Sequence, residues 1–432
     1  PPAALTACSC DRELLRELGS ALAEECRENG VDLLLGPGVN IKRHPLCGRN
    51  FEYFSEDPYL AGELGVAYVR GLQDSGVGAV VKHFAMNNQE KARLCSDSVA
   101  DERARREIYL SPFEIIVKKG DPWAMMCSYN RVDGEYASQN AALLTDVLRK
   151  DWGYRGLVMS DWGAVYERAT GAAAGLDLEM PGNGGVNDRI AADAAVRKEL
   201  PEAALDECAR RVLTLAKRVS GGRTRLVGAH TPEQLNAFAR RLAAESLVLL
   251  KNENALLPMK RGKTFTVIGA LARTPRVQGG GSAGVKAAKI TSFLDALDAE
   301  HILYEFAEGY SLGETDTEDT LLEEAVALAR NSERVLLFAG TPAEDECEGF
   351  DRPHLRLPDV QTRLIERILA ENANTAVVLS AAGPLEMPWI ERARAVLFCY
   401  LPGQAGGAAI ADVVLGDVSP SGKLAETFPL RL

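Results

Sequence analysis

The chain has 432 residues, of which 46% are hydrophobic and 25% are charged. These values are typical of soluble globular proteins, and the length favours two domains over one. The formal net charge of −12 argues against a nucleic acid or an anionic membrane as a partner, so a small neutral substrate fits better. No run of about 18 apolar residues indicates a membrane span, and no basic segment followed by an apolar one indicates a secretion signal.

The nine cysteines are odd in number and widely spaced along the chain. This pattern favours reduced thiols over a disulfide framework, and reduced thiols favour a cytoplasmic location. Cys8 and Cys10 lack the second pair of ligands that a zinc site needs, so we expect no metal there.

Residues 1 to about 220 repeat one unit, in which a helix is followed by a short apolar strand and then by polar or glycine-rich residues. Such alternation predicts an α/β fold with a parallel sheet and favours a (β/α)8-type TIM-like barrel. The barrel is incomplete in this chain, because five strands are too few for eight. The expected strands are 32–35, 79–81, 124–126, 156–160 and 176–178.

The strand expected at 156–160 runs directly into Asp161, and Trp162 and Gly163 follow. Sites in parallel β/α proteins are built at the carboxyl ends of the strands, so Asp161 is a candidate catalyst. The alternative is an aspartate that caps the next helix.

The second half of the chain follows a polar, glycine-bearing stretch that we interpret as an interdomain linker. Thr231-Pro-Glu predicts a helix N-terminus, and apolar spacing extends that helix to about Asn252. Alternating strands and helices then predict an α/β sandwich with a mostly parallel, doubly wound sheet. The expected domains are a barrel over 1–218, a linker over 219–232 and the sandwich over 233–432. The expected strands of the sandwich are 265–268, 302–306, 335–339, 375–379 and 395–400, and its expected helices are 319–330, 359–371 and 404–415.

Three groups of residues outside this pattern bear on chemistry. Gly279, Gly281 and Gly284 match G-x-G-x-x-G, but they lie about ten residues beyond a strand, which disfavours a dinucleotide site and favours a loop near some other site. Lys82 and His83 follow a strand and offer a general base, an anion clamp or donors to hydroxyl groups, although a lone buried histidine is more often structural.

The acidic loop from Glu344 to Arg352 follows the strand expected at 335–339. It lacks the spacing and the glycine of an EF-hand, which leaves a solvated turn or a carboxyl group whose pKa is raised by like charges. A raised carboxyl suits a general acid. Asp161 together with an acid from this loop suggests glycoside hydrolysis by paired carboxylates.

Several motifs, in their order along almost the whole chain, resemble the β-glucosidases of glycoside hydrolase family 3. They are Leu35-Gly-Pro-Gly-Val-Asn-Ile-Lys-Arg43, Cys47-Gly-Arg-Asn-Phe-Glu-Tyr-Phe-Ser-Glu-Asp-Pro58, Lys82-His-Phe-Ala-Met-Asn-Asn88, Met126-Cys-Ser-Tyr-Asn130, Leu157-Val-Met-Ser-Asp-Trp-Gly163, Glu245-Ser-Leu-Val-Leu-Leu-Lys-Asn252, Glu348-Gly-Phe-Asp-Arg352 and Pro402-Gly-Gln-Ala-Gly406.

The resemblance implies a retaining, exo-acting mechanism without a metal or organic cofactor. Asp161 would attack the anomeric carbon, and Glu348 would protonate the leaving oxygen and later activate water. The choice of Glu348 over Glu346 depends on the Glu-Gly step of the motif. The continuation after Lys82-His-Phe differs from that of the N-acetylglucosaminidase branch, which favours the glucosidase branch.

The resemblance also implies a set of substrate-binding residues. Positions matching those that bind sugar hydroxyls are Arg49, Lys82 and His83, and aromatic positions beside the nucleophile are Tyr129 and Trp162. Charged donors bind neutral hydroxyls strongly, and an apolar sugar face stacks on aromatic rings.

The chain also departs from the family pattern at both ends. In the family an Asp-Gly-Pro segment at the first barrel strand lies upstream of the residue that matches Pro1, and a fibronectin-like domain follows the residue that matches Leu432. We therefore expect a truncated member with weak activity on aryl β-glucosides. The alternatives are a β-xylosidase and a catalytically inactive sugar-binding homologue, and the sequence leaves a homo-oligomer open.

Overall fold

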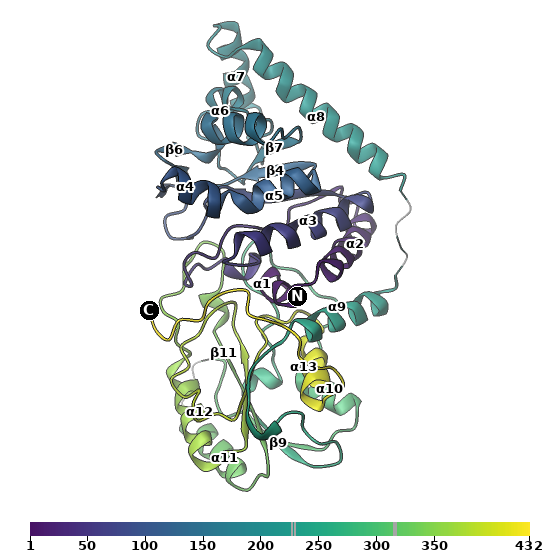
Figure 1. Ribbon diagram of the computed structural model, residues 1–432, viewed down its shortest axis with the longest axis vertical. Coiled ribbons are helices and arrows are strands. Elements are labelled where there is room, and N and C mark those ends of the chain that lie inside the picture. Colours follow the sequence, from purple (N-terminus) through teal and green to yellow (C-terminus); the bar gives the residue numbers. More distant parts are fainter. Residues whose placement is uncertain (226–227, 229, 314–317) are drawn as a thin grey trace. The chain divides into compact units, whose positions relative to one another are not determined.

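The computed structural model describes residues 1–225, 228, 230–313 and 318–432. They group into two compact units (Figure 1). Unit 1 comprises Pro1–Cys10, His44–Glu52 and Thr231–Leu432, and unit 2 comprises Asp11–Arg43 and Tyr53–His230. The predicted domains place Pro1–Cys10 and His44–Glu52 with the barrel, whereas the contacts of these two segments group them with the second half of the chain.

Unit 2 is built around a parallel sheet in the order β1-β2-β4-β7. Its strands are β1 (Leu33–Leu34), β2 (Gly78–Phe84), β4 (Ala124–Cys127) and β7 (Leu157–Ser160). Four predicted strands are thus confirmed, and the fifth is reduced to a single parallel bridge between Leu178 and Met159. The predicted TIM-like class is confirmed, and among the described residues β1 and β7 are the edges of an incomplete barrel.

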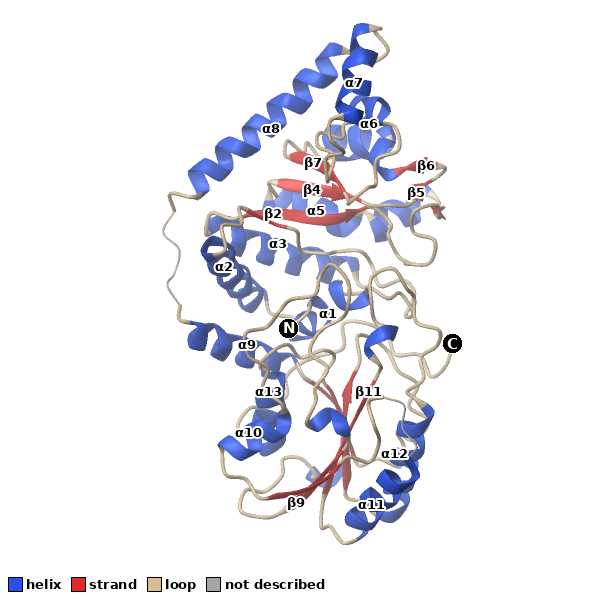
Figure 2. Cartoon of the chain, turned by 180° about the vertical axis from the view of Figure 1, so that it is seen from behind, coloured by secondary structure: helices blue, strands red, loops and turns tan. Residues whose placement is uncertain are grey.

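Helices bound the sheet of unit 2 (Figure 2). Aspartates begin two of them: Asp11 accepts hydrogen bonds from the first turn of α2, and Asp57 does the same for α3. The helices are α2 (Arg12–Glu28), α3 (Pro58–Asp74), α4 (Glu102–Ala104), α5 (Ser111–Gly120), α6 (Arg168–Ala174), α7 (Val186–Val196) and α8 (Glu202–Gly222), with π-helical turns at Arg105–Tyr109 and Ala142–Asp151. A small separate sheet joins β3 (Asp97–Ser98), β5 (Arg131–Val132) and β6 (Glu135–Tyr136).

Unit 1 contains a six-stranded sheet in the order β10-β9-β11-β12-β13-β8. Its strands are β8 (Val248–Asn252), β9 (Phe265–Ile268), β10 (Tyr304–Ala307), β11 (Val335–Gly340), β12 (Thr375–Ser380) and β13 (Ala395–Phe398). The central strands are buried at every position, as is typical of a parallel sheet covered on both faces. The predicted sandwich with a mostly parallel sheet is confirmed.

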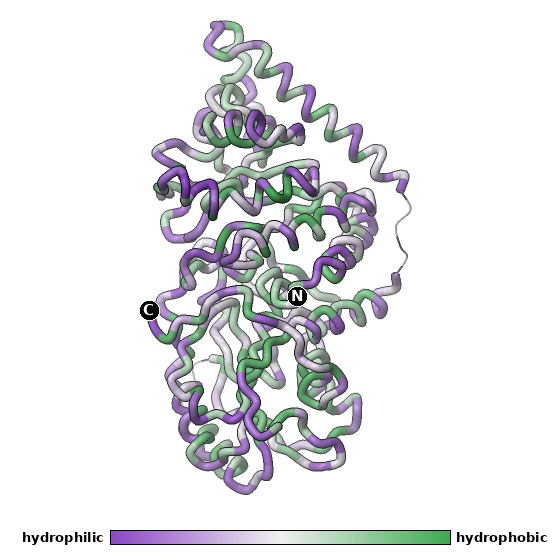
Figure 3. The backbone as a smooth tube through the Cα atoms, in the orientation of Figure 1, coloured by the Kyte–Doolittle hydropathy of each residue, from purple (hydrophilic) through white to green (hydrophobic). Residues whose placement is uncertain are grey.

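Helices cover both faces of this sheet, with α11 and α12 on one side and α10 and α13 on the other (Figure 1). All ten residues of α13 are buried, and Figure 3 shows it as largely hydrophobic. The helices are α1 (Ala3–Thr6), α9 (Pro232–Ser246), α10 (Phe293–Ala299), α11 (Glu318–Arg330), α12 (Asp359–Glu371) and α13 (Gly406–Leu415).

The prediction that the helix starting at Thr231 continues to about Asn252 is wrong. The helix α9 ends at Ser246, and Leu247 turns to an extended conformation. The following residues form β8, which pairs antiparallel with β13 at the edge of the sheet. Leucines at helical spacing misled the prediction, because the edge of β13 offers backbone hydrogen bonds that a Val-Leu-Leu run satisfies equally well as a strand.

Three further predictions concern the linker, the cysteines and membrane-spanning segments. The linker prediction, 219–232, includes residues 226, 227 and 229, which lie outside the described residues, and α8 extends to Gly222. None of the nine cysteines forms a disulfide bond. In the described part of the chain, no helix combines the length and the apolar character needed to cross a membrane.

Candidate active site

Asp161 lies directly after β7, at the carboxyl end of the sheet of unit 2. Its side chain is only 10% exposed. One carboxylate oxygen, Oδ1, accepts a hydrogen bond of 2.7 Å from the backbone N–H of Trp162, and the other, Oδ2, lies 3.6 Å from Nε2 of His83. The alternative of a helix cap is wrong, because the next helix begins at Arg168.

His83 lies in β2 and is 1% exposed. Its backbone N–H donates to Oδ1 of Asn40 at 2.8 Å, and its carbonyl accepts from Nδ2 of Asn40 at 2.9 Å. The ring nitrogen Nδ1 lies 3.3 Å from Oδ1 of Asn40 and 3.3 Å from the hydroxyl of Tyr53. Asn40 and Tyr53 therefore fix the backbone and ring of His83, so that Nε2 faces Asp161.

A series of hydrogen bonds between polar side chains leads from the Tyr53 hydroxyl to Arg93. Nδ2 of Asn87 donates to the Tyr53 hydroxyl at 3.3 Å and to Glu90 at 3.5 Å. Glu90 accepts a hydrogen bond of 2.8 Å from Arg93, whose guanidinium carbon lies 4.5 Å from the centre of the Tyr129 ring. One face of the buried Tyr129 ring is thus covered by a cation, an arrangement that holds the ring in place.

Lys82 and Trp162 are more accessible than their neighbours. The main chain of Lys82 is bound on both sides, since its N–H donates to Pro37 at 3.0 Å and its carbonyl accepts from Val39 at 2.8 Å. Its side chain is half-buried. Trp162 is 43% exposed, so its indole offers the aromatic surface that a sugar ring can stack on.

Arg49 belongs to unit 1 and is 1% exposed. Its Nε and Nη2 each donate to one carboxylate oxygen of Glu52 at 2.8 Å, which is a two-pronged ion pair. The remaining nitrogen, Nη1, lies 3.5 Å from Oε1 of Glu348. Because Glu52 is three residues further along a 3-10 turn, the local chain brings the pair together.

Glu348 lies in the loop after β11, and its side chain is 12% exposed. Its Oε2 accepts a hydrogen bond of 2.8 Å from the backbone N–H of Ser282, and a second one from the Ser282 hydroxyl. The main chains also pair: Gly280 bridges Cys347, and the Glu348 N–H donates to the Gly280 carbonyl at 3.2 Å. The glycine-rich motif therefore lies along the loop that carries Glu348.

Glu346, the other candidate acid of this loop, is fully buried. Its Oε1 accepts from the backbone N–H of Ala382 at 2.6 Å, and its Oε2 accepts from Arg276 at 3.0 Å. Both oxygens are thus occupied by protein donors that anchor the loop. Burial lowers the pKa of the nearby Arg352, and the negative charge of Glu346 opposes that change.

The structure brings the predicted residues together in two groups. His83 and Asp161 face each other in unit 2, and Arg49 and Glu348 face each other in unit 1. The other predicted residues of unit 2 occupy the same strand ends or the residues after them: Lys82, Tyr129 and Trp162.

Sequence reasoning missed the groups that hold these residues: Asn40, Glu52, Tyr53 and Ser282. The glycine motif pointed to a loop near a site, but nothing in the sequence paired Ser282 with an acid 66 positions away. Glu52 carried a local signal, since a carboxylate three residues after an arginine on a helical turn can reach it.

One cluster of acids outside the site resembles a metal site in its composition. Glu300, Asp412 and Asp417 bring their oxygens close together. Arg240 pairs with Glu300 and Asp412, and Arg261 pairs with Glu300 and Asp417. Each of the three carboxylates is thus paired with at least one of two arginines, so we assign no metal to this cluster.

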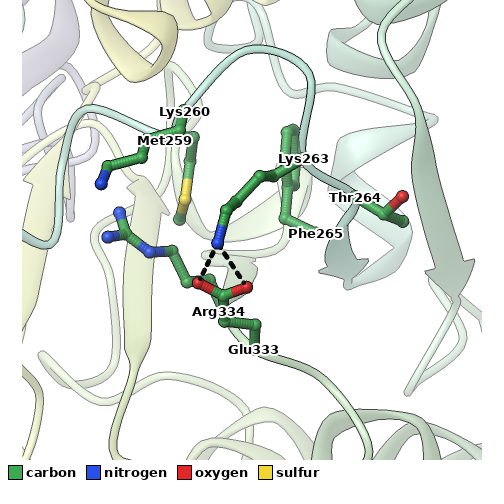
Figure 4. Close-up of a pocket in the computed structure, with 7 residues that line it drawn as sticks. All are labelled: Met259, Lys260, Lys263, Thr264, Phe265, Glu333 and Arg334. Carbon is green, nitrogen blue, oxygen red and sulfur yellow. Dashed lines mark hydrogen bonds and ion pairs between the residues drawn. The ribbon is translucent and has the colours of Figure 1, made fainter.

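Figure 4 shows a small pocket at the amino ends of β9 and β11, where Lys263 donates to both oxygens of Glu333 at 3.0 Å. Its volume of about 10 Å³ holds no more than a water molecule. The loop that carries Glu348 leaves the opposite, carboxyl end of β11, so this pocket is separate from the candidate site. Its lining residues are Met259, Lys260, Lys263, Thr264, Phe265, Glu333 and Arg334.

Comparisons with protein families match both halves of the chain. The model of the glycosyl hydrolase family 3 N-terminal domain matches residues 1–215, and that of the glycosyl hydrolase family 3 C-terminal domain matches residues 247–432.

Individual relatives agree with these matches. Thermostable beta-glucosidase B of Acetivibrio thermocellus is 47% identical over 437 residues, and the exo-alpha-(1->6)-L-arabinopyranosidase of Bifidobacterium breve is 46% identical over 443 residues. Each comparison covers all of this chain and 58% of the relative, so the chain spans little more than half the length of either. A crystal structure of a family 3 beta-glucosidase of Bifidobacterium adolescentis superposes with a TM-score of 0.96 and 46% identity, covering 100% of this chain and 64% of that one.

Proposed function

Because this chain belongs to glycosyl hydrolase family 3, we propose that it is a retaining, exo-acting β-glucosidase. It releases the non-reducing terminal β-D-glucosyl residue of oligosaccharides or of aryl and alkyl glucosides. The observation that carries this proposal is the buried carboxylate of Asp161, held beside His83 at the carboxyl end of β7.

In the proposed mechanism Asp161 is the nucleophile. Its carboxylate attacks the anomeric carbon while the glycosidic C–O bond breaks, and Glu348 transfers its proton to the leaving oxygen. In the second step Glu348 takes a proton from water, the water oxygen bonds to the anomeric carbon, and the bond to Asp161 breaks. The Trp162 N–H on Oδ1 orients the carboxylate for attack and needs no rearrangement. The two carboxylates supply the nucleophile and the proton, so the reaction needs no metal or organic cofactor.

We assign the acid/base role to Glu348 and not to Glu346. A general acid must reach the leaving oxygen, and Glu348 is the more accessible of the two. Both oxygens of Glu346 already accept hydrogen bonds, from Ala382 and Arg276. Proton transfer by Glu346 would break contacts that anchor its own loop.

We assign the binding of the glucosyl hydroxyls to Arg49, Lys82 and His83, whose N–H groups suit neutral oxygen acceptors. Trp162 provides an accessible aromatic surface for the apolar face of a sugar, and Tyr129 provides a ring fixed beneath Arg93. The substrate is accordingly a small neutral sugar.

Two other activities remain as alternatives within the same chemistry. A β-xylosidase needs only a small change of the pocket, because its substrate lacks one hydroxymethyl group. The relative from Bifidobacterium breve, at 46% identity, is named an arabinopyranosidase, which adds a second pentose to the comparison. A catalytically inactive sugar-binding homologue is the alternative from another class, and the presence of both Asp161 and Glu348 disfavours it.

The test is mass spectrometry after incubation with a 2-deoxy-2-fluoro-β-glucoside, which forms the covalent intermediate but breaks it down slowly. We expect a hexose-sized adduct on the peptide that contains Asp161, absent in Asp161→Asn. The corresponding fluoroxyloside and fluoroarabinoside are the matched probes for the pentose alternatives. If no probe labels the chain while isothermal calorimetry detects glucose binding, the inactive homologue is the better description.

We also propose that the protein acts in the cytoplasm without nucleic acid or membrane partners. The nine cysteines outside disulfide bonds support the location, and the net charge of −12 supports the absence of anionic partners. Cell fractionation tests the cytoplasmic location. Light scattering of the purified chain tests whether it forms a homo-oligomer.

A further inference from the structure

The carboxylate of Glu348 is held by two donors from one residue, Ser282. The backbone N–H of Ser282 donates to Oε2 at 2.8 Å, and its hydroxyl donates to the same oxygen. Oε1 faces Nη1 of Arg49 at 3.5 Å. The two oxygens of Glu348 therefore differ in these partners, since Ser282 holds Oε2 and Arg49 faces Oε1.

The chain around Ser282 is built to make this contact. Gly281 has a φ of +100°, which favours glycine, and a Cβ at this position would overlap the Cβ of Glu348. Gly280 pairs with Cys347 in a parallel bridge, so the two loops run along each other before Ser282 is reached. The position of Ser282 against the carboxylate follows from this pairing.

Three segments of unit 1 place charged or polar groups near Glu348. Nη1 of Arg49 faces this carboxylate, and the other two nitrogens of the guanidinium donate to Glu52. On the acid loop itself, Glu346 turns to Arg276, and Asp351 accepts from the Gly48 N–H at 3.1 Å. The glycine loop contributes the neutral donors of Ser282. No second acid of the described residues shares Ser282 with Glu348 in this network.

We propose that Ser282 is a positioning residue that orients Glu348 and sets the pH at which this carboxyl gives up its proton. This inference rests on the acid/base role of Glu348 in the proposed function. Two donors on one oxygen favour the ionised carboxylate and hold it in one orientation. A leaving oxygen that draws the proton from Glu348 thus receives it from a carboxyl whose charged product is already stabilised.

The first experiment compares pH profiles of kcat/KM for Ser282→Ala and the parent chain. Without the hydroxyl, the ionised form loses one donor, so we expect the basic limb to move upward by about one pH unit. Methyl β-glucoside needs strong protonation of its leaving oxygen, and we expect about a tenfold loss of kcat for it. For 2,4-dinitrophenyl β-glucoside, whose leaving group needs little protonation, we expect less than a threefold loss.

The matched control is Ser421→Ala, which removes an exposed hydroxyl that donates to the Glu245 carbonyl. It should change neither the profile nor the ratio of the two substrates. Ser282→Thr keeps the hydroxyl and should restore most of the parent profile. Equal losses for both substrates with an unmoved basic limb would overturn the positioning role.

A second measurement does not depend on catalysis. NMR titration of the ¹³C-labelled Glu348 carboxyl, assigned by its loss in Glu348→Gln, gives the midpoint directly in the parent and in Ser282→Ala. An upward shift supports the inference even in a chain that hydrolyses no glucoside, which would refute the proposed function alone. An unchanged midpoint overturns the inference whatever the activity.

Discussion

The main chain at Gly281 lies against the side chain of Glu348, so closely that a Cβ at Gly281 would overlap the Cβ of Glu348. Gly281 also has a φ of +100°, which a side chain disfavours. This contact aligns the glycine-rich loop with the loop of the proposed acid, and the alignment gives a structural reason for a glycine at position 281.

We predict that Gly281→Ala lowers kcat/KM for aryl β-glucosides at least 100-fold. The added methyl group displaces one loop from the other, and a misplacement of about 1 Å is enough for a loss of this size. Steady-state kinetics checks the loss. Gly313→Ala is the matched control, because a Cβ there meets no atom within 4 Å. A Gly281→Ala variant as active as its parent would contradict the role of the contact.

A second prediction concerns Asn40, which binds both the N–H and the carbonyl of His83. Asn40→Ala leaves two buried backbone groups without these partners, so we expect the free energy of unfolding to fall by about 2–4 kcal/mol. Activity should fall as well, because the ring of His83 loses one of the groups that orient it.

Urea unfolding measures the loss of stability for Asn40→Ala. Asn29→Ala serves as the control, because its amide donates to the Glu25 carbonyl at an exposed helix end and its removal should cost no more than about 0.5 kcal/mol. Equal stabilities of the two variants would show that Asn40 does not support His83.

Most of the fold follows from the sequence, because strands buried on both faces and helices with one apolar face have distinct patterns. The helix at 359–371 and the strand at 265–268 match their predicted bounds. Local pattern failed at Val248–Asn252, where pairing with β13 decides between helix and strand. It also could not group His44–Glu52 with unit 1, because that grouping depends on contacts with residues some 300 positions away.

The sequence alone proposes the reactive groups of the site but not the residues that hold them. Asp161 is marked by its place after an apolar strand, and Glu348 by its motif. Ser282 and Asn40 act through hydrogen bonds between distant segments, and a polar residue in a loop carries no sign of its partner. The Glu-Gly step of the motif favours Glu348 over Glu346, and the burial and bound oxygens of Glu346 add a reason that the sequence does not reveal.

The buried ion pair of Arg49 and Glu52 leads to a third prediction. Arg49→Ala leaves the buried carboxylate of Glu52 without its two-pronged partner, so we expect a loss of about 3–5 kcal/mol in the free energy of unfolding. Removing Glu52 as well should recover part of that stability but none of the activity, because Arg49 is proposed to bind the sugar.

A double-mutant cycle followed by urea unfolding and kinetics tests this pair. Arg363 is the control, since it pairs with Asp319 at the surface and Arg363→Ala should cost no more than about 0.5 kcal/mol. Additive losses for Arg49 and Glu52 would mean that the two side chains do not stabilise each other.

A fourth prediction concerns alkaline pH. Burial raises the pKa of Cys127 from its ordinary value of 9.0 to about 12. The Cys127 carbonyl accepts a backbone hydrogen bond from Asp161. Between pH 9 and pH 11 the unfolded chain loses this proton while the folded chain keeps it, so the stability contributed by the buried thiol is present below pH 9 and falls as pH rises. One such proton corresponds to about 1.4 kcal/mol per pH unit.

In Cys127→Ala the free energy of unfolding should therefore fall less steeply with pH, by about 1.4 kcal/mol per pH unit between pH 9 and pH 11. The cavity left by the sulfur costs the same at every pH, so it shifts the curve without changing this slope. Denaturant unfolding at several pH values measures the difference. A Cys127→Ala variant with the same slope as the parent chain would contradict the assignment.

The last prediction separates the two acids of the loop by their different environments. Glu348→Ala removes the proposed acid/base, so the glycosyl-enzyme should form with 2,4-dinitrophenyl β-glucoside and then persist. Azide needs no general base, and we expect it to restore turnover and to yield β-glucosyl azide. Glu346→Ala instead leaves the Ala382 N–H and Arg276 without their buried acceptor, so we expect a loss of about 2–4 kcal/mol in stability and no rescue by azide. Product analysis by NMR and thermal unfolding distinguish the two, and azide rescue of Glu346→Ala would reverse the assignment.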